Sequence, residues 1–398
     1  MRGLEADTRQ ALDTYLRSDS RRPIAVGLSG GGDSLALTLL ADAWARDVGR
    51  ELLILNVDHG LQTASAAWAR TCAAIAARLD RPFRALAWTG EKPTTGLPAA
   101  ARRARHRLLA EVAREAGAAV VLLGHTADDR AEAAAMRAAG GTTPDARVWS
   151  PSPVWPEGRG VFLLRPLLNA RRADLCAWLA ARGETWIDDP ANTDLRYARS
   201  RARATDPVTA PPTAQDVPLS LAAQAQEQAS VVTMDRAALA RAPLDEARRF
   251  VGLAAVCAGG GERLPSGARV VRATEALLSD GPLTTTLAGA RIEAADGSVR
   301  FMREAGEARR GGLASARLPT VWDGRFVLSG AGEVRRAAGL VRQLSPADQM
   351  RLQTLPASAR GAMPVIIGED GVARLAPFAS LVGDRLRAAA GLIQREPA

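Results

Sequence analysis

The stretch IAVGLSGGGDSLAL, residues 24–37, decides the class of fold. Its first five residues are apolar and fit one buried strand, and an apolar helical pattern resumes over 35–44. The three successive glycines between them let backbone N–H groups approach a ligand closely, and the start of the following helix favours negative charge. The stretch therefore predicts a strand, an anion-binding turn and a helix.

Asp33 argues that this turn binds a ligand and is not only a structural connection. A carboxylate inside an anion site is unfavourable unless a cation such as Mg²⁺ joins it to a phosphate. We therefore expect a nucleotide and Mg²⁺, with Asp33 as the metal ligand. The predicted nucleotide-binding residues are Ser29, Gly30, Gly31, Gly32, Asp33 and Ser34.

Strands and helices alternate along the first half of the chain. Further strands are expected over 51–57, 83–88, 118–123 and 161–165, and 140–160 is expected to be a long loop. This alternation predicts a doubly wound parallel α/β sheet with helices on both faces, whose ligands bind beyond the carboxyl ends of the strands.

A proline-rich stretch over 206–217 indicates a linker. We expect a catalytic domain over 1–210, a smaller helical and α+β domain over 218–310, and a mixed α+β domain over 311–398. Within the middle domain, 219–258 is expected to be largely helical. Asp-Gly pairs at 296–297 and 323–324 predict tight turns between strands.

Composition narrows the classes of function. The net charge of +9 indicates an anionic partner, although only 4% aromatic residues leave little surface for base stacking. The three cysteines are far apart and form no C-x-x-C, which argues against structural zinc and disulfides. No signal peptide or membrane-length apolar run is present, so we expect a cytoplasmic protein without a membrane partner. The sequence leaves the oligomeric state open, a homodimer included.

A second polar cluster follows the strand expected over 118–123. It contains His125, Asp128, Asp129 and Glu132. Capping of the next helix explains one carboxylate but not four polar groups at one strand end. Two carboxylates there could join Asp33 in binding Mg²⁺, or they could bind an ammonium group. We predict Asp33, His125, Asp129 and Glu132 as catalytic residues.

Two groups of arginines leave alternatives open. Arg102 and Arg105 share one helix face, and their spacing alone favours a solvated basic face. Arg199, Arg201 and Arg203 follow an acidic turn and fit a surface segment or a phosphate contact equally well. The candidates for substrate contact are Arg102, Arg105, Asp128, Arg199, Arg201 and Arg203.

The glycine turn resembles the Ser-Gly-Gly-x-Asp-Ser loop of the N-type ATP pyrophosphatases. An ordered set of motifs is similar to those of the tRNA(Ile)-lysidine synthases over residues 21 to about 205. These motifs are His59-Gly60-Leu61, Gly96-Leu97 before Ala101-Arg102-Arg103-Ala104-Arg105, Gly124-His125 with Asp128-Asp129-Arg130-Ala131-Glu132, Arg165-Pro166-Leu167-Leu168, and the stretch 188–194.

This resemblance implies a ligase that uses ATP and Mg²⁺. In that family, O2 of the first anticodon cytidine of tRNA(Ile) with a CAU anticodon is adenylated. Free L-lysine then displaces AMP at C2, giving lysidine. The resemblance also implies that the glycine turn holds pyrophosphate, that His125, Asp129 and Glu132 handle lysine and the activated base, and that the C-terminal part binds tRNA. It further implies that Arg102 and Arg105 face a phosphate or the lysine carboxylate.

Three features depart from the family's pattern: Pro98 replaces an acidic residue, Thr126 a histidine, and Gly140-Gly141-Thr142-Thr143 an Arg-Gly-Ser-Gly segment. Three alternative functions stay open. A related tRNA thiolase would need a cysteine pair or a cysteine-bound cluster, and none is evident. An ammonia-using ligase such as a GMP or NAD synthetase would need no basic extension. A nucleotide-gated RNA-binding protein without catalysis would need fewer acids.

Overall fold

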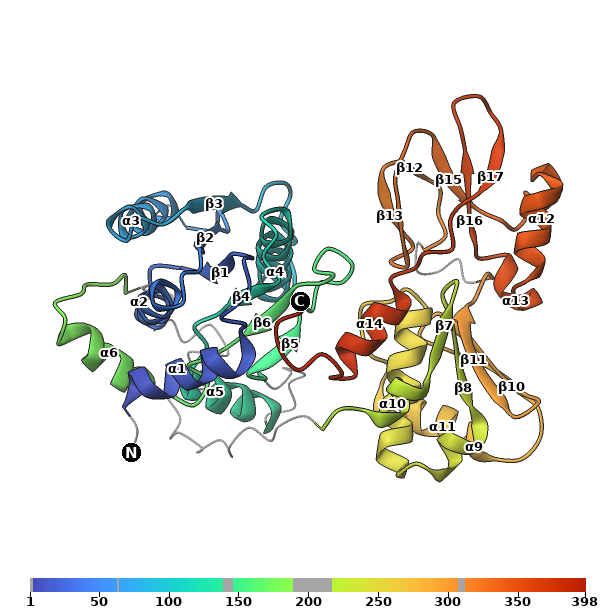
Figure 1. Ribbon diagram of the computed structural model, residues 1–398, viewed down its shortest axis with the longest axis horizontal. Coiled ribbons are helices and arrows are strands. Elements are labelled where there is room, and N and C mark those ends of the chain that lie inside the picture. The colour runs from blue at the N-terminus through green and yellow to red at the C-terminus, as the bar shows by residue number, and fades with distance from the viewer. Residues whose placement is uncertain (1–2, 63, 139–145, 189–216, 307–311) are drawn as a thin grey trace. The chain divides into compact units, whose positions relative to one another are not determined.

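The computed structural model describes residues 3–62, 64–138, 146–188, 217–306 and 312–398 (Figure 1). The chain divides into two compact units, Met1–Gln215 with Ile393–Ala398, and Asp216–Leu392. Three domains were expected from the sequence. The division at 310/311 stays a prediction, since residues on both sides of it belong to the second unit. The linker predicted over 206–217 lies, except for its last residue, outside the described residues.

The first unit is built on a six-stranded sheet with the strand order β3-β2-β1-β4-β6-β5. All neighbouring strands run parallel except β5, which is antiparallel to β6. The strands are β1 (Ile24–Gly27), β2 (Leu52–Asp58), β3 (Phe83–Ala87), β4 (Val120–Leu122), β5 (Trp149–Pro151) and β6 (Phe162–Leu164). The chain order reverses between β1 and β4, so the crevice beyond their carboxyl ends is the topological switch point. The predicted doubly wound sheet is confirmed.

Helices cover both faces of this sheet (Figure 1). They are α1 (Leu4–Tyr15), α2 (Gly32–Asp47), α3 (Ser65–Arg78), α4 (Leu97–Glu115), α5 (Ala127–Ala138) and α6 (Arg172–Ala180). Successive residues of β1 point to opposite faces: Ile24 and Val26 join the core with α2, α3 and α6, whereas Ala25 joins the core with α4. A central strand buried on both sides explains why the run at 24–28 is wholly apolar.

Two local expectations about the first unit were wrong. The helix after the glycine turn begins at Gly32 and not at Leu35, so Asp33 and Ser34 lie in its first turn. The loop expected over 140–160 contains β5, which pairs with β6 from Trp149 to Pro151. A three-residue edge strand that includes a proline has almost no sequence signal.

The second unit contains a five-stranded antiparallel sheet of order β7-β8-β11-β10-β9. Its elements are α8 (Ser220–Gln224), β7 (Gln226–Gln228), β8 (Val231–Asp235), α9 (Arg236–Arg241), α10 (Leu244–Ala258), α11 (Gly267–Leu278), β9 (Leu283–Leu287), β10 (Ala290–Ala295), β11 (Ser298–Arg303) and α14 (Val382–Ala389). The expectation that 219–258 is largely helical is confirmed by α8, α9 and α10, but the stretch also contains the hairpin of β7 and β8, which was not expected. Ala229 and Ser230 adopt positive φ angles and turn the chain between β7 and β8.

A four-stranded sheet of order β12-β15-β16-β17 and the hairpin β13-β14 complete the second unit. The elements are β12 (Ala316–Arg317), β13 (Thr320–Trp322), β14 (Phe326–Leu328), β15 (Glu333–Arg336), η2 (Val341–Gln343), α12 (Pro346–Gln353), α13 (Ala357–Arg360), β16 (Pro364–Ile367) and β17 (Ala373–Leu375). Both Asp-Gly turns are confirmed, with positive φ at each residue of the two pairs. Asp323 of the second turn is buried and accepts hydrogen bonds from Arg303 and Arg325, so this turn belongs to the core.

No helix within the described ranges combines the length and the apolar character needed to cross a bilayer.

Candidate active site

The loop between β1 and α2 is braced by its two serines. The N–H of Ser29 donates to Ser34 Oγ at 3.1 Å, and Ser34 Oγ donates to the carbonyl of Gly31 at 2.9 Å. The two hydroxyl oxygens lie 3.0 Å apart. Ser34 is buried and Ser29 is exposed. The Ser34 hydroxyl therefore fixes the loop, and the Ser29 hydroxyl is the one open to a ligand.

Two glycines permit close approaches that shape this region. Gly30 has a φ of +90°, and a Cβ there would overlap the side chain of Ile187, whose N–H donates to the Gly30 carbonyl at 2.9 Å. A Cβ on Gly124 would lie 2.9 Å from the carbonyl oxygen of Asp33. The end of β4 thus abuts the start of α2, which brings the second polar cluster beside the glycine loop.

Arg172, at the start of α6, joins three of the predicted catalytic carboxylates. Its Nε donates to Asp33 Oδ2 at 2.8 Å, and its Nη atoms lie 3.7 Å from Asp129 Oδ2 and 3.6 Å from Glu132 Oε1. Burial raises the pKa of Asp33, and Asp129 adds to the rise while Arg172 opposes it. Three carboxylates therefore lie around this one guanidinium.

Two of these acidic residues also have structural roles. Asp129 Oδ2 accepts hydrogen bonds from the N–H (2.8 Å) and the hydroxyl (3.1 Å) of Thr126, the residue that precedes α5. Asp128 Oδ2 accepts from the N–H of Arg172 at 2.8 Å and thereby caps α6. Asp128 therefore positions Arg172 through the backbone. Thr126, which departs from the family's pattern, ties the start of α5 to Asp129.

The residues around Asp33 fit a Mg²⁺ ion that is shared with a nucleotide. The buried Oδ1 of Asp33 has no hydrogen-bond partner among the described residues. Mg²⁺ in nucleotide sites commonly takes one or two carboxylates together with substrate phosphates and waters. Within the described ranges, no group of three or more His, Cys, Asp or Glu side chains is placed to hold a metal ion by itself.

His125 follows β4 and is held by a buried arginine. Its Nδ1 accepts a hydrogen bond from Arg165 Nε at 3.2 Å, so the ring proton belongs on Nε2. Burial, then Arg165, Arg105 and Arg102, hold the pKa of His125 well below its ordinary value. Arg165 donates in addition to the carbonyl of Arg147 and to Ser150 Oγ. At neutral pH, His125 is thus an uncharged hydrogen-bond donor through Nε2.

One cavity of about 1040 Å³ lies at the carboxyl edge of the sheet, at the switch point. The predicted residues that line it are Ser29, Gly31, Gly32, Asp33, Ser34, Arg105, His125 and Asp129. Gly30, Arg102, Asp128 and Glu132 do not line it, although Glu132 is connected to it through Arg172. Arg199, Arg201, Arg203 and the segment 140–143 lie outside the described residues.

Sequence reasoning assigned no site role to Arg172, Trp186 and Ile187, all of which line the cavity. Arg172 had a signal, because a cation in the first turn of a helix opposes the helix dipole and implies an acidic partner elsewhere. Trp186 and Ile187 had none, since their contacts with Gly32 and Gly30 depend on the chain returning to the loop.

The cysteines show no sign of activation. Cys72 is fully buried, and burial raises its pKa to about 11. Cys176 lines the cavity, and burial followed by the charge of Asp33 raises its pKa. Cys257 is buried in the second unit, with its pKa also raised to about 11 by burial. All three are free thiols.

Known proteins are similar in sequence to most of this chain. The sequence profile of the PP-loop domain matches residues 4–205. A tRNA(Ile)-lysidine synthase from Caulobacter vibrioides is 47% identical over 410 residues, which cover 98% of each chain. Those from Hyphomonas neptunium and Methylobacterium nodulans are 36% and 35% identical, over 80% and 74% of this chain and 90% and 94% of theirs. The chain therefore belongs to the tRNA(Ile)-lysidine synthase family.

Proposed function

We propose that the protein joins L-lysine to C2 of the first anticodon cytidine of tRNA(Ile) with a CAU anticodon. The reaction consumes ATP, passes through a cytidine adenylated at O2, and releases AMP and pyrophosphate. One observation carries this proposal. The glycine loop and an acidic cluster of excess negative charge, from separate parts of the chain, face one cavity.

The glycine loop binds the leaving pyrophosphate. The start of α2 supplies backbone N–H groups and a favourable helix dipole, and the exposed Ser29 hydroxyl adds a donor. Asp33 Oδ1 is the atom that would hold Mg²⁺, which neutralises charge on the phosphates when it is bound. The Ser34 brace keeps this loop in shape before ATP arrives.

The acidic cluster receives the cationic substrate. Asp129 faces the cavity beside Arg172, and the aspartates that line the cavity outnumber its arginines, so the site attracts the ammonium groups of lysine. Arg105, also on the cavity wall, is placed to bind the lysine carboxylate or a phosphate. His125 acts as a donor through Nε2–H toward negative charge that develops on the substrate.

The decisive experiment incubates the protein with ATP, Mg²⁺, labelled lysine and tRNA(Ile) carrying the CAU anticodon. We expect label in the RNA and one AMP for each lysine incorporated. Methionine tRNA has the same anticodon and is the control for discrimination. AMP release without incorporation of lysine would contradict the proposal.

A cysteine-free variant separates lysidine formation from thiolation. Substitution of Cys72, Cys176 and Cys257 by serine should leave lysine incorporation intact, because the pKa of each thiol is raised and none is poised as a thiolate. The single variant Cys176→Ser is tested alongside, because it removes the only cysteine that lines the cavity and leaves the two buried cysteines in place if the triple variant misfolds. A requirement for Cys176 together with transfer of sulfur would favour the thiolase.

A further inference from the structure

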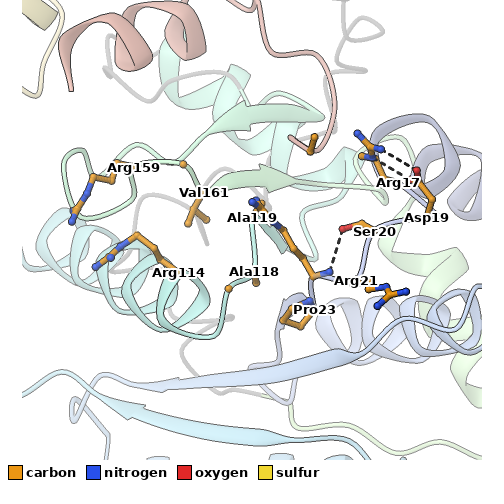
Figure 2. A pocket seen from close by; sticks show the side chains of 14 residues that line it. Arg17, Asp19, Ser20, Arg21, Pro23, Arg114, Ala118, Ala119, Arg159 and Val161 are labelled. Carbon is orange, nitrogen blue, oxygen red and sulfur yellow. Dashed lines mark hydrogen bonds and ion pairs between the residues drawn. The ribbon is translucent and has the colours of Figure 1, made fainter. Parts of the chain in front are cut away.

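A second cavity, of about 780 Å³, lies at the opposite edge of the same sheet (Figure 2). Pro23, Ala119 and Val161 line it, and each of these residues directly precedes a strand: β1, β4 and β6 respectively. Because these strands are parallel, their amino ends share the edge that faces away from the glycine loop. The cavity beside the glycine loop and this second cavity are therefore separate sites in the first unit.

Positive charge dominates the walls of this second cavity. Five arginines line it: Arg17, Arg21, Arg22, Arg114 and Arg159. Among its lining residues, all of which the structure describes, Asp19 is the one acidic side chain, and it already binds Arg17 through two hydrogen bonds of 3.1 and 2.9 Å. The arginine charge here is therefore left largely without acidic partners.

Arg114 and Arg159 come from different elements and meet at this cavity. Arg114 lies in the last turn of α4, and Arg159 lies on the loop before β6 (Figure 2). Arg159 Nη1 donates to the carbonyl of Pro156 at 3.0 Å, whereas the Arg114 side chain has no hydrogen bond or ion pair with the described residues. Burial lowers the pKa of Arg159, and the charge of Arg114 lowers it further. The charge of Glu157 acts on Arg159 in the opposite sense, but neither guanidinium forms an ion pair with a carboxylate among the described residues, so the two can bind an anion.

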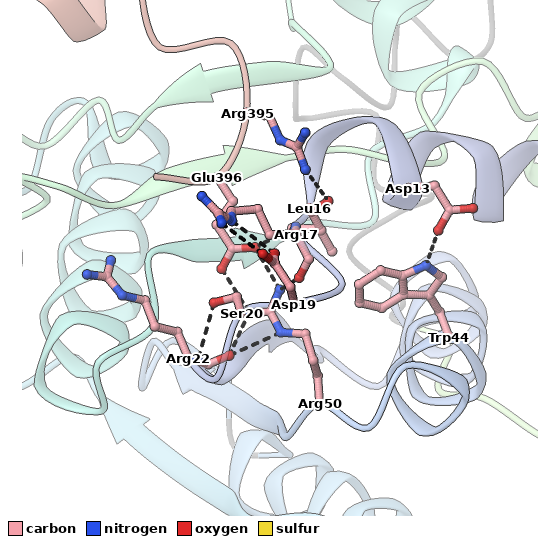
Figure 3. A network of polar contacts seen from close by, with 10 residues as sticks. All are labelled: Asp13, Leu16, Arg17, Asp19, Ser20, Arg22, Trp44, Arg50, Arg395 and Glu396. Carbon is pink, nitrogen blue, oxygen red and sulfur yellow. Dashed lines mark hydrogen bonds and ion pairs between the residues drawn. The ribbon is translucent and has the colours of Figure 1, made fainter. Parts of the chain in front are cut away.

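A buried ion pair fixes the arginine-rich segment 17–22 in place (Figure 3). Arg50 binds Glu396 through hydrogen bonds of 2.6 and 2.8 Å, and the two side chains are 1% and 0% exposed. Arg50 also donates to the carbonyls of Arg17 and Arg22, and Glu396 accepts from the N–H of Arg17 at 2.9 Å. The backbone that carries the arginines is thus ordered before a ligand arrives, which lowers the entropic cost of binding.

We propose that this arginine-lined cavity binds a phosphate group, and that the group belongs to the backbone of the tRNA substrate. Arginine is suited to the task, since its planar guanidinium can donate two hydrogen bonds to one phosphate. The tRNA source rests on the function proposed above. A free phosphate such as the product pyrophosphate offers the same chemistry, and the experiment separates the two sources.

The test compares two double variants of equal charge. Arg114→Gln/Arg159→Gln removes the pair in the cavity, and Arg70→Gln/Arg84→Gln removes two exposed arginines elsewhere in the first unit. We expect the first variant to bind tRNA about tenfold more weakly at ~100 mM salt. Its logarithmic salt slope should fall by about 1 to 2, because each lost phosphate contact removes about one counterion released. The control should bind like the wild type.

A second arm measures binding of inorganic pyrophosphate by calorimetry, with a non-hydrolysable ATP analogue occupying the glycine loop. Loss of pyrophosphate binding in Arg114→Gln/Arg159→Gln with unchanged tRNA affinity would assign the cavity to a free phosphate and overturn the tRNA source. If neither ligand distinguishes the two double variants, the phosphate site itself is refuted. Lysine incorporation by Arg114→Gln/Arg159→Gln is measured as well. A raised KM for tRNA with normal incorporation at saturating tRNA would show that the variant still catalyses the proposed reaction and has lost only tRNA affinity.

Discussion

The two edges of the central sheet carry opposite surpluses of charge. At the carboxyl edge, four aspartates and two arginines line the cavity: Asp33, Asp58, Asp129, Asp188, Arg105 and Arg172. At the amino edge, five arginines line the cavity, and Asp19, which binds Arg17, is the one acidic side chain among the lining residues. The net charge of +9 describes neither edge, because it averages over both. The comparison teaches that the carboxyl edge combines an anion-binding loop with carboxylates, whereas the amino edge offers mainly guanidinium groups.

The edges also differ in how they are ordered. Loop hydrogen bonds and the packing of Ile187 shape the carboxyl edge, where Asp33 keeps an oxygen without a partner. The amino edge is ordered by the buried ion pair of Arg50 and Glu396, in which both carboxylate oxygens of Glu396 accept hydrogen bonds. Asp33 therefore has an oxygen left to bind a ligand, whereas both oxygens of Glu396 stabilise the fold.

The largest expected effect comes from Asp33→Asn. This change removes the proposed Mg²⁺ ligand and should lower AMP formation by about 10²- to 10³-fold. Stability should change little, because burial already disfavours the charged form of Asp33. Asp174→Asn, an exposed carboxylate on α6, is the matched control. Single-turnover AMP release and a urea titration measure the two properties, and near-normal AMP release would remove Asp33 from the mechanism.

Glu396→Gln makes the same chemical change at the amino edge and should affect stability instead. Loss of one partner leaves Arg50 charged and buried, which costs about 3–5 kcal/mol. The urea midpoint of the first unit should fall accordingly, while the KM for ATP stays unchanged. Asp47→Asn, which breaks an exposed pair with Arg9, should shift the midpoint much less. Equal shifts in both variants would mean that the buried pair does not order this edge.

Gly30→Ala tests the packing that shapes the carboxyl edge. The substitution places a Cβ against Ile187 at a φ of +90°, and should cost about 1–2 kcal/mol in backbone strain alone. Gly49→Ala has a similar positive φ but open space around it, so it reports the strain without the contact. We expect the KM for ATP to rise only in Gly30→Ala. Recovery in Gly30→Ala/Ile187→Ala would show that the contact is responsible, and a rise in Gly49→Ala would contradict this.

The smallest effect concerns His106 on α4, the helix that contributes Arg105 to one cavity and Arg114 to the other. His106 is 3% exposed, and neither ring nitrogen has a hydrogen-bond partner among the described residues. Burial, then Arg105 and Arg102, hold its pKa well below the ordinary value. In the unfolded chain this histidine takes up a proton near pH 6.5, whereas in the folded chain it stays neutral. Its contribution to the free energy of unfolding is therefore fully present above that pH and is lost as the pH falls below it.

In His106→Leu, the free energy of unfolding should fall less steeply with decreasing pH, by up to about 1.4 kcal/mol per pH unit below pH 6.5. Urea titrations from pH 5 to 8 measure it, and above pH 7 the variant's slope should match that of the wild type. Parallel curves over the whole range would show that His106 does not contribute.

Local physical rules account for what could be predicted from the sequence. Consecutive glycines before a helix, a buried apolar run, and Asp-Gly pairs between alternating residues each depend on near neighbours, and the corresponding loop, strand and turns were found where expected. The β7–β8 hairpin was missed because a short strand among helix-forming residues has no distinctive period. The placement of Asp33, His125 and Asp129 around one cavity followed from the rule that parallel strands end at one edge.

The sequence by itself determined the α/β class, the anion-binding turn and the acids that follow the strands. Only the tertiary structure decided which charges meet. Arg172 and Asp33 are 139 residues apart, and Arg50 and Glu396 are 346 apart. Spacing along a helix or strand reports contacts within one element, whereas these pairs form because the topology returns distant segments to the same sheet edge. The opposite charges of the two edges are therefore a property of the fold.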